Sequence, residues 1–129
     1  KRSAEGLRTA LNKFIDDLEH RPRLTEEDIK EVVADLTSQM NRQESYLRYL
    51  TEARASLLVL LQGPFEPDLK QQVVVPELLE MIDRRFSAHR EMFVILDLGI
   101  HRLLVLRDKV LVLEGEEMSS PSFWGDDEP

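Results

Sequence analysis

The feature that most constrains this chain is a stretch of 37 residues, 26–62, that contains neither glycine nor proline. Just before it, Thr25 to Asp28 resembles a capping box in which Asp replaces the usual Glu or Gln. Gly63-Pro64 follows it, a glycine that ends helices and a residue that cannot continue one. We therefore predict a single helix over residues 26–62, on the order of 55 Å long.

Apolar residues in this helix recur at alternating spacings of four and three, which is the pattern of a coiled-coil seam. The ten positions are Ile29, Val33, Leu36, Met40, Gln43, Leu47, Leu50, Arg54, Leu57 and Leu61. Two of them are polar, Gln43 and Arg54. Either these residues fix the register of helix pairing, or the seam ends near solvent there.

A second long helix is predicted over residues 76–113, because Pro76 is a favoured first helical residue and Glu114-Gly115 would end it. Its seam has the same alternation: Leu79, Ile82, Phe86, His89, Phe93, Leu96, Ile100, Leu103, Arg107 and Val110. Two matched helices favour an antiparallel hairpin. Residues 73–75, all valine, favour an extended arm before Pro76. Gly99 would permit a bend or a close helix contact.

A shorter helix is predicted over residues 3–20, where Leu7, Leu11, Phe14 and Leu18 share one face. It should fold back along Ile29–Met40 of the long helix. The fold class is therefore all-α: an elongated, coiled-coil-like antiparallel hairpin with a shorter N-terminal third helix, which we expect to oligomerise. We expect a helical bundle over residues 1–115 and an acidic, disordered tail over residues 116–129.

Composition excludes several classes of protein. The chain has no cysteine, and therefore no disulfide scaffold or thiolate metal site. Its 25 acidic and 17 basic residues give a net charge of -8, which argues against general nucleic-acid binding. Residues 114–129 hold six of the acidic residues and no basic one, so the helical body is close to neutral. No apolar run approaches the ~20 residues of a membrane span.

The hairpin tip is the main candidate interaction surface. Residues 55–61 are apolar nearly all round the helix, and a helix without a polar face must be buried on more than one side. The predicted partner interface comprises Leu57, Leu58, Leu60, Leu61, Leu78, Met81, Ile82, Phe86 and Met92. The alternative is that the connection over residues 64–75 covers this surface completely.

Two weaker candidates remain. A basic patch of Arg48, Arg54, Arg84, Arg85 and Arg90 would receive an acidic partner, unless these arginines are paired locally, as Glu80 with Arg84. The tail carries an acidic-aromatic motif suited to docking in a groove: Phe123, Trp124, Asp126 and Asp127. The histidines and adjacent carboxylates lack the spacing of a metal or catalytic site, so we predict no catalytic residue, metal or cofactor.

These patterns predict a non-enzymatic protein–protein interaction or oligomerisation module, using its apolar seams and the hairpin tip over residues 55–93. We expect a homo-oligomer or a helical partner protein, within a larger intracellular scaffold or adaptor, cytoplasmic or nuclear. A chain that begins at Lys1 is expected to be a fragment of that larger protein. The alternative is a monomeric regulatory docking domain that binds a short peptide or its own acidic-aromatic tail.

Overall fold

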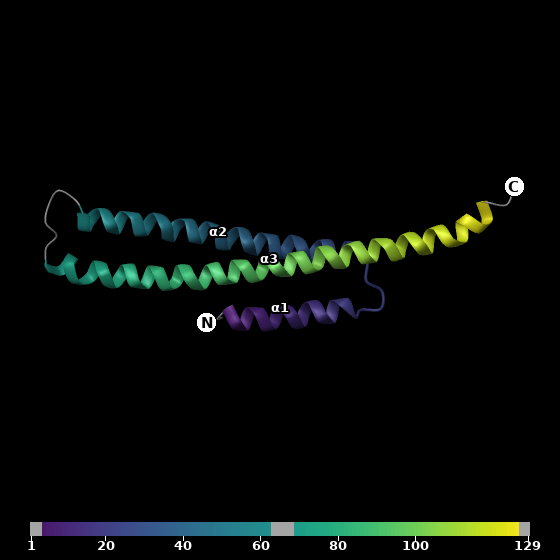
Figure 1. Cartoon of the computed structure of the whole chain (residues 1–129), viewed down its shortest axis with the longest axis horizontal. Helices are drawn as coiled ribbons and strands as arrows, with labels where there is room; N and C mark the ends of the chain where they lie inside the picture. The colour runs from purple at the N-terminus through teal and green to yellow at the C-terminus, as the bar shows by residue number, and fades with distance from the viewer. Residues whose placement is uncertain (1–3, 63–68, 127–129) are drawn as a thin grey trace.

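The described part of the protein consists of three helices, which confirms the all-α prediction. The computed structural model describes residues 4–62 and 69–126, and none of these residues lies in a strand. The helices are α1 (Ala4–Glu19), α2 (Glu26–Gln62) and α3 (Leu69–Asp126). α2 and α3 run side by side as a long hairpin, and α1 lies along the half of the hairpin that is far from its tip (Figure 1).

α2 has the bounds that the sequence pattern indicates, and reciprocal hydrogen bonds cap its first turn. The Thr25 backbone N–H donates to Asp28 Oδ2 over 3.0 Å, and the Asp28 N–H donates to Thr25 Oγ1 over 3.2 Å. The hydrogen bond from the Thr25 N–H is the main cause that holds the pKa of the Asp28 carboxyl below its usual range. The hydrogen bonds at the helix start therefore favour the ionised form of Asp28.

The two polar seam positions of α2 both contact α3. Gln43 Oε1 lies 2.7 Å from His89 Nδ1, and Arg54 Nε donates to Asp83 Oδ1 over 2.8 Å. Because residue numbers rise along α2 as they fall along α3, these pairs define an antiparallel register. Gln43 and His89, one from each predicted seam, thus meet across the hairpin.

α3 is longer at both ends than its predicted range of 76–113. It begins at Leu69, so residues 73–75 are helical rather than an extended arm. Val75 is buried, and this packing offsets the backbone hydrogen bond that Pro76 cannot donate. At the other end the helix passes through Gly115 and continues to Asp126, so residues 116–126 are helical where we expected a disordered tail. Gly115 does not adopt the positive φ of a helix-ending glycine.

α1 runs antiparallel to α2 and parallel to α3, and its apolar face completes the core. Ile15 of α1, Ile29 of α2 and Leu103 of α3 are fully buried in one cluster. The other buried members of that cluster are Leu11, Leu18, Leu36, Ile95, Leu96, Leu106 and Val110. Burying an isoleucine side chain contributes about 1.5–3 kcal/mol, so α1 is a structural part of this end of the hairpin.

Candidate interaction surface

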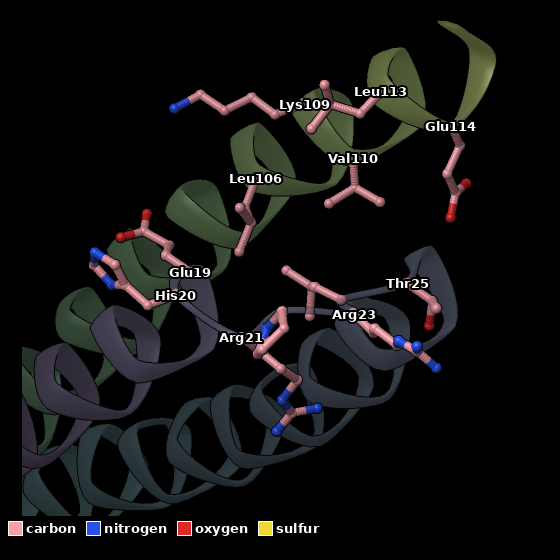
Figure 2. A pocket seen from close by; sticks show the side chains of 12 residues that line it. Glu19, His20, Arg21, Arg23, Thr25, Leu106, Lys109, Val110, Leu113 and Glu114 are labelled. Carbon is pink, nitrogen blue, oxygen red and sulfur yellow. The ribbon is translucent and has the colours of Figure 1, made fainter. Parts of the chain in front are cut away.

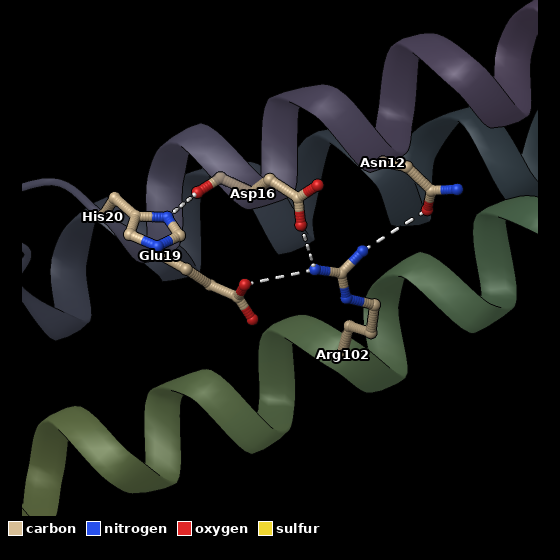
Figure 3. A network of polar contacts seen from close by, with 5 residues as sticks. All are labelled: Asn12, Asp16, Glu19, His20 and Arg102. Carbon is tan, nitrogen blue, oxygen red and sulfur yellow. Dashed lines mark hydrogen bonds and ion pairs between the residues drawn. The ribbon is translucent and has the colours of Figure 1, made fainter.

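α1 packs along α3 and covers only half the length of the α2–α3 hairpin. Arg102 of α3 fixes its position by donating to Asp16 Oδ1 over 2.9 Å, to Glu19 Oε1 over 3.2 Å and to Asn12 Oδ1 over 3.3 Å (Figure 3). The hydrogen bond to Asp16 is the main cause that raises the pKa of the Arg102 guanidinium. A basic residue on α3 therefore holds a helix that presents carboxylates along its edge.

Gly99 permits α1 to approach α3 closely. A Cβ atom at this position would lie 2.7 Å from Leu11 Cδ2, closer than carbon atoms pack. The close helix contact foreseen for Gly99 is therefore present in the fold. It lies near the middle of α1, where Leu11 and Ile15 enter the core.

Residues spaced seven apart along a helix lie in one row on its surface. Such rows show which residues of α2 and α3 continue the line of α1 toward the hairpin tip. Val32 and Asp35 of α2 line a groove beside Leu7 and Phe14 of α1. Their rows continue beyond α1 through these residues: Arg42, Tyr46, Tyr49, Ala53, Ser56 and Leu60. On α3, Ile95 and Gly99 lie beside α1, and their rows continue as Met92, Ala88, Arg85, Met81, Leu78 and Val74. We call the surface formed by these two sets of residues the open half-groove.

The structure places the nine predicted interface residues in two groups. Leu57, Leu61, Ile82 and Phe86 belong to the seam and are partly buried between α2 and α3. Leu58, and Met92 at the α1 end of the open half-groove, are also partly buried. Leu60, Met81 and Leu78 lie in the open half-groove and are 47%, 42% and 37% exposed. None of the nine is fully buried.

A ring cluster forms the wall of the open half-groove nearest to α1. The Tyr46 ring packs edge-on against His89 with centroids 4.5 Å apart, and it stacks on Tyr49 at 6.1 Å. Partial burial lowers the pKa of the His89 imidazole, and the nearby charge of Arg85 lowers it further. This cluster gives the groove a preformed aromatic wall.

The five arginines of the predicted basic patch are all exposed but do not share one face. Arg85 lies in the row of Gly99, on the flank that faces α1, whereas Arg90 lies in the row of Asp83 on the opposite flank. Arg48 and Arg54 also lie toward that opposite flank, where Arg54 pairs with Asp83. Arg84 pairs with Glu80 at 3.6 Å, as the local-pairing alternative expected.

The turn between α1 and α2 forms a pocket of about 760 Å³ that sequence reasoning missed (Figure 2). Apolar side chains on one side come from Leu106, Val110 and Leu113 of α3. Basic side chains at its edges come from Arg21, Arg23 and Lys109. The turn is too short for sequence periodicity, so only the packing of α1 on α3 reveals the pocket.

A second feature that we missed is an exposed apolar stripe on the outer face of α3. Leu98 and Val105 are 61% and 57% exposed, and Val94 and Val112 extend the stripe. The spacing of these residues repeats the heptad of the main seam on another face, which is the signal that could have revealed it.

Of the acidic-aromatic motif, the structure describes only backbone atoms. Phe123, Trp124 and Asp126 belong to the last turns of α3, but their side chains, and Asp127 entirely, lie outside the described residues. Within the described chain, no cluster of three or more His, Asp or Glu side chains is arranged to hold a metal ion.

None of the described helices is both long enough and apolar enough to cross a membrane. Comparisons with protein-family models, curated proteins and solved structures find no match to this chain.

Proposed function

We propose that this chain is a non-enzymatic protein-interaction module, in which the tip half of the α2–α3 hairpin receives a helix from another molecule. The supporting observation is the unequal coverage of the hairpin. One half buries its apolar residues under α1, and the other half leaves Leu60, Leu78 and Met81 exposed at the equivalent positions. A third helix in the open half-groove would restore the packing that α1 provides.

The module would serve in a scaffold or adaptor protein, whose task is to hold partners together. Its helices supply a long surface of side chains at regular spacing, which is how helices recognise other helices. A second copy of the chain and an unrelated helical protein are both compatible with this proposal.

Sedimentation equilibrium of the chain, alone and with a neutral amphipathic helical peptide, tests the proposal. We expect either self-association or peptide binding, and we expect Leu60→Glu and Met81→Glu to weaken it at least tenfold. Because both residues are exposed, these variants should remain folded by circular dichroism. Val105→Glu is the matched control, since Val105 is at least as exposed as Leu60 and Met81 but lies on the outer stripe.

A monomer that does not bind the peptide would refute the proposal. Association that all three variants weaken equally would also refute it, because the tip would then have no special role.

The pocket at the α1–α2 turn supports a second candidate, a docking site for a short acidic peptide. Its apolar side suits an apolar anchor, and its three basic residues, Arg21, Arg23 and Lys109, outnumber the two acidic ones in the lining, Glu19 and Glu114, which favours a peptide that carries carboxylates. The chain's own tail is a less suitable occupant, since residues 116–126 would have to leave α3. A monomeric chain that binds a peptide copy of residues 116–129, with affinity lost in Lys109→Glu, would favour this candidate.

A further inference from the structure

The covered half of the groove shows what kind of helix the fold accepts. α1 presents Leu11 and Ile15 to the core, and it presents Asp16 and Glu19 at its edge to Arg102. An apolar face and an acidic edge are therefore the two properties that seat α1.

The open half-groove offers the same combination of apolar floor and basic residue. Val74, Leu78 and Met81 supply apolar surface on α3, and Leu60 supplies it on α2. The rows defined above carry two charges beyond α1, Arg42 and Arg85, and both are positive. The nearest acidic residues, Glu52, Glu77 and Glu91, lie one row further out, and Glu91 lines the pocket that also contains Arg8 of α1.

Arg85 lies on the same flank of α3 as Arg102, one row nearer the seam than Arg102's own row of Ile95 and Met81. It lies in the row of Gly99, two heptads nearer the tip, and its side chain is exposed. Arg102 forms ion pairs with two carboxylates of α1, whereas Arg85 and Arg42 form none within the described part of the chain. Arg85 lies one helical turn before His89, so its charge is beside the ring cluster that walls the groove.

We infer that the open half-groove binds an amphipathic helix from a partner protein, with carboxylates along the edge of its apolar face. This inference rests on the proposed function and specifies the partner's chemistry. Along α2 the open half-groove extends from Arg42 to Leu60, about 28 Å at 1.5 Å per residue, which is the length of a helix of about 18 residues. Carboxylates on that helix form charge-assisted hydrogen bonds with Arg85 and Arg42.

A pair of synthetic peptides tests the inference on the full chain. Both are 18-residue helices with leucine and alanine on one face, and they carry either glutamate or lysine at the edge positions. Fluorescence anisotropy should show that the glutamate peptide binds at least tenfold more tightly than the lysine peptide. Arg85→Glu should reverse this preference. Arg90→Glu makes the same charge change on the opposite flank and should preserve it.

The outcomes separate this inference from the proposed function. If both peptides bind equally and Met81→Glu abolishes both, the acidic partner is wrong but the interaction module stands. If the chain instead self-associates through the tip and excludes both peptides, the occupant is a second copy and the inference is overturned. If neither peptide binds and the chain is monomeric, the inference and the proposed function both fail.

Discussion

Adding one methyl group at Gly99 should not give the stabilisation that the same change gives at Gly115. Both glycines lie inside α3, where alanine is favoured over glycine by about 1 kcal/mol. At Gly115 a Cβ atom meets nothing within 4 Å, so Gly115→Ala should stabilise by up to about 1 kcal/mol. At Gly99 the Cβ atom meets the buried Leu11 side chain at 2.7 Å. Overpacking of this kind costs about 1–3 kcal/mol, so Gly99→Ala should be neutral or destabilising by up to about 2 kcal/mol.

A double-mutant cycle with Leu11→Ala isolates this contact. Leu11→Ala alone should cost about 2–5 kcal/mol, because it removes a buried side chain and leaves a cavity. In the Gly99→Ala background the same truncation also relieves the clash. The double variant should therefore be more stable, by about 1–3 kcal/mol, than the sum of the two single-variant changes in unfolding free energy predicts. Urea denaturation followed by far-ultraviolet circular dichroism measures all four free energies of unfolding. Additivity within about 0.5 kcal/mol, or equal stabilisation by the two glycine substitutions, would refute the close packing of α1 on α3.

Three further changes test the contacts that hold the helices. Arg102→Ala should destabilise the protein by about 1 kcal/mol, because it removes ion pairs with α1 that are partly exposed. The loss should be smaller at about 1 M salt, which screens such pairs, and a loss that salt leaves unchanged would contradict an ionic role for Arg102. Thr25→Ala should lower the stability measured in thermal melts by about 1 kcal/mol, because it removes the oxygen that accepts from the Asp28 N–H. Thr37→Ala, in the middle of the same helix, should not cause this loss. The lowered pKa of His89 means that the unfolded chain binds more protons near pH 6.5, so stability should fall as the pH drops below about 6.5. His89→Gln should flatten this dependence in urea titrations between pH 7 and 5, and an unchanged slope would show that other groups cause it.

Repeating patterns in the sequence predicted the fold class, the bounds of α2 and the pairing of its seam with that of α3. Those patterns span many turns, so many residues support each conclusion. The ends of α3 were not predictable in this way. At Pro76 and Gly115 the local preference for ending a helix is overridden in the folded chain, and at Pro76 the buried Val75 supplies a packing reason that no local rule contains.

The candidate surface was predictable only in part. The sequence identified Leu60, Leu78 and Met81 as apolar residues near the tip, but it did not separate them from Leu57 and Phe86 of the seam. It also grouped Arg85 with Arg90, although the two residues lie on opposite flanks of α3. Both distinctions depend on which flank α1 covers, and that follows from the packing of Leu11 against Gly99.

The order in which these helices meet follows from how far apart their contacts lie along the chain. Arg54 and Asp83 are 29 residues apart, whereas Asp16 and Arg102 are 86 residues apart. Closing the longer loop from the unfolded chain costs about 1 kcal/mol more, but once the hairpin has formed, the short turn after Glu19 holds α1 next to its site. α1 should therefore dock last in folding and detach first in transient opening. Its backbone amides should exchange with deuterium sooner than those of α2 beside Leu36, which makes α1 a separately opening unit of an otherwise cooperative hairpin.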